Sequence, residues 1–223
     1  MRCLGLVLVV FVLISSRPAG AGAWMREERE VFLSLTGTLR QGDPDARQEL
    51  SVYSEYGLSP RLTLGTDINE RPGLSGHALV FARLPLRPPA ARTRLAVETA
   101  FGGHHWRGRW HPMYRLTLSA GRSFTTAQGA NGWLAVDAAY ERRLGAPVPA
   151  YKLDATLGLS SPGRIRPILQ IETAHIPGKP LFWAVTPGLT IDGRGTATWL
   201  VGLERKSAGR DTLGLKIGLW RRF

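Results

Sequence analysis

Ser75 and His77 are the residues whose types and spacing best suit a catalytic nucleophile and its base. A serine hydroxyl reacts when a neighbouring imidazole accepts its proton and a third group orients that imidazole. Residues two apart on a strand project from one face, and Glu98 is the candidate third group. The flanking Pro72 and Gly73, however, are typical of an ordinary loop. We therefore expect no enzyme, and keep a lipid hydrolase as a distant alternative.

The segment from Gly102 to His111 holds three of the five histidines: His104, His105 and His111. Imidazole is the commonest metal ligand in proteins. The segment has no cysteine or carboxylate, and its spacing matches no structural zinc site. We expect neither a metal nor a cofactor here. Contact with lipid headgroups is the preferred interpretation, and solute recognition is the alternative.

Residues 1–23 have the pattern of a secretory signal peptide: a short basic start, an apolar run over 4–14, and small residues ending at Ala23. The apolar run is too short to span a bilayer as a helix. Cleavage after Ala23 would leave one domain, 24–223. Because Cys3 lies in the signal, the mature chain would contain no cysteine and no disulfide.

Apolar and polar residues alternate along most of the remaining chain, interrupted by short Gly, Pro, Asn or Asp clusters. In the last such segment Leu213, Leu215 and Ile217 share one face, while Gly214 and Lys216 share the other. A period of two predicts strands with two chemically different faces. We expect twelve strands, near 31–39, 48–57, 61–69, 77–86, 93–102, 113–124, 132–142, 150–159, 165–175, 181–191, 197–206 and 212–223.

The length of these strands separates two all-β folds. A soluble sandwich also alternates, but its strands need only about five or six residues. Segments of about ten residues match tilted strands that cross hydrocarbon. We therefore predict an all-β fold: a closed antiparallel up-and-down transmembrane β-barrel of about twelve strands, with both chain ends on one side.

The chain end, Trp220-Arg221-Arg222-Phe223, resembles the C-terminal signature of bacterial outer-membrane β-barrels. Leu219 and the final Phe223 fit the pattern, whereas Arg221 stands where a second hydrophobic residue is usual. The resemblance implies a protein of the cell outer membrane. It also implies that Phe223 is the assembly signal, which the barrel-assembly machinery reads.

A second resemblance lies in Glu55-Tyr56-Gly57-Leu58-Ser59-Pro60-Arg61-Leu62-Thr63-Leu64-Gly65. This strand, turn and strand is similar to poorly characterised proteobacterial barrels grouped with the phenol-degradation MetA-pathway type. Gly and Pro shape the turn. The resemblance implies a barrel that passes small molecules, and it transfers no catalytic residues.

Charged residues within the polar strand faces are the candidate lumen lining. Seven acids against six bases predict a nearly neutral interior. Such residues either pair across strands and hold the barrel together, or they line a narrow channel for small polar or amphiphilic solutes. A structural barrel without transport therefore stays open. The candidates are Glu55, Asp67, Glu98, Asp137, Asp154, Glu172, Glu204, Arg83, Arg94, Arg115, Lys152, Arg166 and Lys216.

The formal net charge of +12 then has to lie at the rims. Arginine pairs well with phosphate oxygens, so outer-membrane lipids and lipopolysaccharide are the expected partners. Steering of an anionic solute is the alternative, and export argues against nucleic acid. The expected rim residues are Arg40, Arg47, Arg71, Arg107, Arg109, Arg142, Arg143, Lys179, Arg205, Lys206 and Arg210.

Aromatic residues near the strand ends are expected at the membrane boundary, where one part of the ring is apolar and the other wet. They are Tyr56, Phe101, Trp106, Trp110, Tyr114, Trp133, Tyr140, Tyr151, Trp183 and Trp199, with Tyr53 and Trp220 facing inward. The longest outer loop is predicted at 102–112. No loop is long enough to fill the lumen as a plug.

Overall fold

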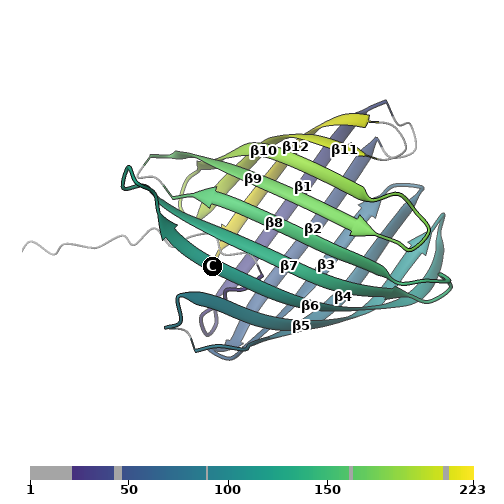
Figure 1. Cartoon of the computed structure of the whole chain (residues 1–223), viewed down its shortest axis with the longest axis horizontal. Helices are drawn as coiled ribbons and strands as arrows, with labels where there is room; N and C mark the ends of the chain where they lie inside the picture. The colour runs from purple at the N-terminus through teal and green to yellow at the C-terminus, as the bar shows by residue number, and fades with distance from the viewer. Residues whose placement is uncertain (1–21, 43–46, 89, 161–162, 208–210) are drawn as a thin grey trace, which may run out of the picture.

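The computed structural model describes residues 22–42, 47–88, 90–160, 163–207 and 211–223. These residues form one closed antiparallel barrel of twelve strands in which each strand pairs with its neighbours in the chain (Figure 1). The strands are β1 (Val31–Gln41), β2 (Gln48–Ser59), β3 (Leu62–Arg71), β4 (Ser75–Pro85), β5 (Thr93–Trp106), β6 (Arg109–Thr125), β7 (Asn131–Arg143), β8 (Ala150–Leu159), β9 (Ile165–His175), β10 (Phe182–Asp192), β11 (Ala197–Ser207) and β12 (Asp211–Arg222).

The first and last strands close the barrel. β1 pairs with β12 in continuous register, for example Leu35 opposite Leu219, and the backbones of Val31 and Phe223 exchange two hydrogen bonds of 3.2 and 3.0 Å. Closure leaves neither strand with an unpaired edge. The predicted fold class and the twelve strands are therefore confirmed. Nowhere in its described part does the chain form a helix long and apolar enough to cross a membrane.

The predicted outer loop at 102–112 is wrong. β5 and β6 continue through it as a hairpin, and only Arg107 and Gly108 form the turn. Both residues have positive φ, 47° and 79°. That is the geometry of a type I′ turn, whose twist matches the twist of the strands it joins. Gly108 adopts this conformation readily, and the sequence pattern missed the strands because glycines and histidines interrupt their alternation.

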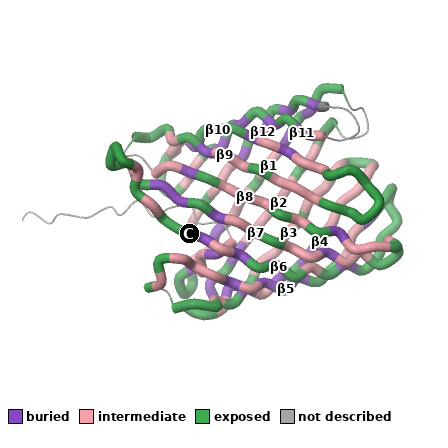
Figure 2. Tube along the Cα trace, viewed as in Figure 1, coloured by how far each residue is buried: buried purple, intermediate pink, exposed green. Residues whose placement is uncertain are grey.

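The two faces of the strands have the predicted chemistry, and their burial changes from position to position along the strands (Figure 2). The outward positions carry large apolar side chains that are exposed on the barrel surface, among them Leu153, Leu203 and Leu215. Tyr114, Tyr140 and Tyr151 form a row of contacting rings on the same outer face, with ring centroids 6.3 and 5.8 Å apart. The outer surface is thus a continuous apolar belt with an aromatic border.

The lumen holds two apolar clusters besides its polar residues. One consists of Leu79, Phe81, Ala100 and Met113, with Tyr53 packed against it. The other consists of Trp133, Ala135, Ile168 and Leu200, against which Trp24 and Trp220 pack. Trp133 is 4% exposed, so its predicted place at the membrane boundary is wrong. Its position alternates with the exposed Leu134, which puts its ring inside.

The segment before β1 crosses one end of the lumen. On one side, Trp24 packs edge-on against Trp133 of β7, with ring centroids 6.2 Å apart. On the other side, the backbone nitrogen of Arg26 donates a 3.2 Å hydrogen bond to Thr63 of β3. Gly57 of β2 allows this approach, because a Cβ there would lie 1.8 Å from the carbonyl oxygen of Glu27. The prediction that no loop is long enough to plug the lumen did not consider this segment, which narrows one end of the lumen and leaves cavities elsewhere in it.

The predicted basic rim is confirmed only in part. Arg47, Arg107, Arg109, Lys179 and Arg205 are exposed. Arg40 and Lys206, 5% and 2% exposed, instead lie on inward positions in the lumen. Arg40 lies beyond the predicted end of its strand, and the longer β1 turns it from a loop position into a wall position. Lys206 lies within its predicted strand and has the inward phase of β11. Arg210 lies outside the described residues.

Candidate functional site

Glu55 on β2 is the centre of an ion-pair network in the lumen. Its carboxylate accepts hydrogen bonds from the guanidinium groups of Arg26 and Arg83, and from the hydroxyl of Tyr53 at 2.7 Å. Arg83 in turn donates a 2.6 Å hydrogen bond to Glu98. Glu55 is only 1% exposed. A carboxylate so far from water is retained only where several donors satisfy it.

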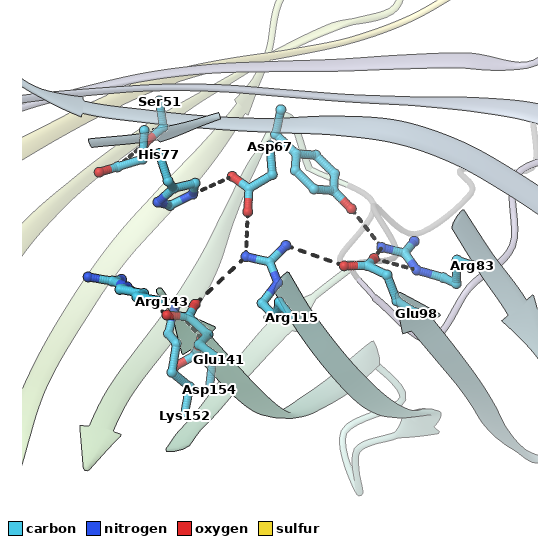
Figure 3. Close-up of polar contacts among 12 residues, drawn as sticks. Ser51, Asp67, His77, Arg83, Glu98, Arg115, Glu141, Arg143, Lys152 and Asp154 are labelled. Carbon is cyan, nitrogen blue, oxygen red and sulfur yellow. Dashed lines mark hydrogen bonds and ion pairs between the residues drawn. The ribbon is translucent and has the colours of Figure 1, made fainter. Parts of the chain in front are cut away.

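Arg115 on β6 extends this network across the lumen (Figure 3). Its Nη1 donates to Asp67 of β3 at 2.7 Å, and its Nη2 donates to Glu98 of β5 at 3.3 Å. Nη1 also lies 4.0 Å from Glu141 of β7. One guanidinium therefore connects strands on both sides of its own, and it narrows the space between them.

A second network joins the strands on either side of the barrel closure. Arg40 of β1 donates to Glu204 of β11 and contacts Glu49 of β2 at 2.7 Å. Lys216 of β12 bonds Glu172 of β9 at 3.1 Å and lies 3.9 Å from Glu204. The Arg40–Glu204 pair crosses the β1–β12 seam, so it strengthens the contact that closes the barrel, and Lys216 joins Glu204 to β12 and β9.

The remaining predicted lumen residues fall into three groups. Lys152 contacts Asp154 at 3.6 Å, and Arg166 pairs with Asp192. Asp137 lies beside Gly22, and its buried Oδ1 has no hydrogen-bond partner among the described residues. Arg94 lies near the end of the barrel, beside Trp24, rather than in its middle.

Several lumen charges were not among the predicted residues. Glu49 and Glu141 lie within the predicted strands 48–57 and 132–142 and have their inward phase, so the alternation itself could have found them. Asp192 stands one residue beyond the predicted end of its strand. Arg26 precedes the first strand, so alternation gives no signal for it. The network around Glu55 therefore contains a cation that strand patterns cannot predict.

Ser75 and His77 both lie on the inward face of β4, as predicted, but they do not form a nucleophile and base. No hydrogen bond joins them in the part of the chain that the structure describes. His77 instead approaches Asp67, with Nε2 3.4 Å from Oδ1. Glu98, the predicted third group, is occupied by Arg83 and Arg115.

The three clustered histidines separate onto the two faces of the β5–β6 hairpin. His104 and His111 stack with ring centroids 5.7 Å apart. His105 lies on the outer face, where its Nε2 is 2.8 Å from Glu70 and its ring packs on Trp110. Among the described residues there is no group of three or more histidine, cysteine or acidic side chains placed to hold a metal.

Two cavities lie along the lumen. The first, of 320 Å³, is bordered by the Glu55 network and by Asp137, Lys152 and Asp154. The second, of 310 Å³, lies toward the end where β12 finishes and is bordered by Arg166, Asp192 and Arg222. Both are lined by the aromatic residues Phe32, Trp133 and Trp220. The interior is thus partly hollow, and these rings stand between its two spaces.

The fold is similar to that of several solved outer-membrane β-barrels. The KdgM porin in complex with disordered oligogalacturonate superposes with a TM-score of 0.58 at 11% identity, covering 86% of this chain and 99% of that one. The NanC porin gives 0.60 at 11%, covering 84% and 98%. LpxR from Salmonella typhimurium gives 0.57 at 9%, covering 85% and 99%.

At these identities the similarity extends to the fold alone. No protein-family model matches the chain, and no curated protein matches it. The resemblance to the phenol-degradation MetA-pathway type is therefore not supported by a family match. What the chain does has to be argued from its lumen.

Proposed function

We propose that the protein is an outer-membrane β-barrel that forms a narrow channel for small polar or amphiphilic solutes. The observation that carries this proposal is the pair of cavities inside the lumen, which share the wall made by Phe32, Trp133 and Trp220. A purely structural barrel has no need of such hollow space. Similarity in fold to porins agrees with the proposal, but one fold serves many functions.

The outer surface supports a place in a membrane. Residues such as Leu39, Val80 and Leu213 are each more than half exposed on it. A soluble monomer rarely exposes a contiguous apolar area of this extent. Lipid would cover the belt, and the row of tyrosines would lie at its boundary. With cleavage of residues 1–23 as an export signal, the chain would reach the outer membrane, lipopolysaccharide and the barrel-assembly machinery.

Membrane integration predicts heat-modifiable migration. The unheated protein, extracted from outer membranes, is expected to run faster on a gel than the boiled form, because a folded barrel resists the detergent. Removal of Phe223, whose ring is 62% exposed on the outer face, is expected to reduce the folded band. Recovery of the intact protein from the soluble periplasm would contradict the proposal.

The ion pairs make the expected channel narrow. Followed through successive ion pairs of the described residues, the Glu55 network contains equal numbers of bases and acids. The six bases are Arg26, Arg83, Arg115, Arg143, Lys152 and Arg222, and the six acids are Glu30, Glu55, Asp67, Glu98, Glu141 and Asp154. It is therefore close to neutral. Selectivity between cations and anions should be weak, since neither sign dominates the narrow part.

Single-channel conductance in a planar bilayer tests the channel. The variant Arg115→Ala with Glu98→Ala removes one charge of each sign. The residues that lose a partner still have another one, because Arg83 remains paired with Glu55 and Asp67 still contacts His77. Conductance is expected in the wild type and is expected to increase in this double variant. The matched control is Thr99→Ala with Leu116→Ala, a directly paired couple on the outer face, which should leave conductance unchanged.

Two results would reject the channel. Absence of conductance in both the wild type and the Arg115→Ala, Glu98→Ala variant would leave a structural barrel. Lipid hydrolysis that disappears in His77→Ala would instead favour an enzyme, although the contacts of Ser75 and His77 do not. A resemblance to the phenol-degradation type would gain support from passage of small aromatic solutes.

A further inference from the structure

The second cavity has the chemical composition of a site for a small cyclic polyol. Its walls combine aromatic rings, hydroxyl groups and an ion pair of planar side chains. Its volume of 310 Å³ is near the lower limit of small-molecule pockets, about 300 Å³. The lining residues on which the inference depends are Trp133, Ser160, Thr190, Thr198, Asp192 and Trp220.

The aromatic wall is held firmly in place. The ring of Trp133 covers Gly158, where a Cβ would lie 2.6 Å from it, and the edge contact with Trp24 supports it from the other side. Trp220 occupies an inward position on β12, between Thr198 of β11 and Ser34 of β1. Trp220 borders both cavities, together with Phe32 and Trp133.

The polar wall faces the same space. Arg166 donates two hydrogen bonds to Asp192, one of 2.8 Å from Nη1 to Oδ2. The hydroxyl of Thr198 lies 3.4 Å from Asp192 Oδ1. The side chain of Asp192 is 40% exposed, so its oxygens keep acceptor capacity for further donors. The guanidinium charge of Arg166 is balanced by this carboxylate, and Arg222, which also borders the cavity, lies 3.9 Å from the carboxylate of Glu30. Arg221 is exposed on the outer side, over the ring of Phe223. This balance argues for a neutral ligand.

We infer that this cavity binds the ring of a neutral monosaccharide, with Trp220 as the stacking surface and Asp192 as a hydroxyl acceptor. A pyranose presents a flat array of C–H groups, which suits the negative face of an indole, and hydroxyl groups around its edge, which suit a carboxylate and threonines. An apolar solute would displace water from Asp192 without using the remaining acceptor capacity of its oxygens, at a cost in affinity. The binding site itself does not depend on the proposed channel; only a role for the site in passage of the sugar rests on that proposed function.

Equilibrium binding tests the site without requiring transport. Glucose is titrated into the detergent-solubilised barrel while tryptophan fluorescence is recorded, and sorbitol serves as the open-chain comparison. A saturable change with glucose but not with sorbitol is expected. Trp220→Leu, which keeps an apolar side chain but removes the π face, is expected to weaken binding about fivefold to tenfold. Trp220→Phe should retain most of it.

Trp199→Leu is the matched control, because Trp199 lies on the neighbouring strand β11 and is exposed on the outer face. It should remove fluorescence intensity without changing glucose affinity. Equal affinity for glucose and sorbitol, or an affinity unaffected by Trp220→Leu in a folded barrel, would overturn the inference. Glucose binding without conductance would reject the channel and retain the sugar site, so the two failures are distinguishable.

Discussion

Replacing Glu55 with alanine is expected to lower the free energy of unfolding by about 3 to 5 kcal/mol. The carboxylate is 1% exposed and accepts hydrogen bonds from Arg26, Arg83 and Tyr53. Its removal leaves Arg26 without its closest carboxylate and removes one of the two acids that hold Arg83. Uncompensated charge in a poorly solvated interior is among the largest destabilising effects of a single substitution. Urea unfolding of the barrel in lipid vesicles measures it.

Glu70→Ala is the matched control for this change. Glu70 also lies in a strand and contacts one basic side chain, the imidazole of His105, but its own side chain is 39% exposed on the outer side. Because solvent screens exposed pairs, its loss is expected to cost less than about 1 kcal/mol. Similar losses for Glu55 and Glu70 would mean that the lumen is hydrated enough to solvate the network.

The segment before β1 gives the Glu55 substitution a second consequence. Arg26 is anchored to Glu55, so the carboxylate holds this segment across the end of the lumen. Its loss should loosen the segment and increase the conductance of the proposed channel. Stability and conductance would then change together in Glu55→Ala, whereas Glu70→Ala should change neither.

The alternation of apolar and polar residues was sufficient to predict the barrel, because one face of each strand lies on the apolar outer surface and the other faces the polar lumen. All twelve strands lie within a few residues of their predicted positions, and inward residues such as Glu98 and Lys216 were assigned from phase alone. The period of two carries this information wherever one face is apolar. It is lost where small residues interrupt the pattern, as in the β5–β6 hairpin.

The partners of the lumen charges were not predictable in the same way. Arg40 and Glu204 lie 164 positions apart in the chain, and their pairing depends on the register across the β1–β12 closure. Arg26 reaches Glu55 from a segment without periodicity. Trp133 is a residue type expected at the membrane boundary, but its position in the alternation of β7 faces the lumen. The alternation, not the residue type, determines where its ring lies. The period of two therefore identified which residues face the lumen, whereas the register between strands and the closure of the barrel determine which of these residues contact one another.

Replacing Leu157 with arginine is expected to cost about 2 to 4 kcal/mol if the position lies near the middle of the membrane. Leu157 projects outward from β8 and is 39% exposed. Its neighbour Thr156 projects inward and lines the 320 Å³ cavity together with Asp137 and Asp154. Arginine at 156 would meet space and carboxylates, whereas arginine at 157 would meet hydrocarbon. Folding yield into vesicles and urea unfolding measure the difference.

Thr156→Arg is a better control than a substitution at Gly158, because the ring of Trp133 covers that glycine and a side chain there would clash. Leu215→Arg extends the comparison to the seam, where Leu215 lies opposite Leu39 of β1 and is 41% exposed. It lies nearer the middle of its strand than Leu157 does in β8, so its cost should be the larger of the two. Equal losses at 156 and 157 would mean that the outer face does not contact lipid.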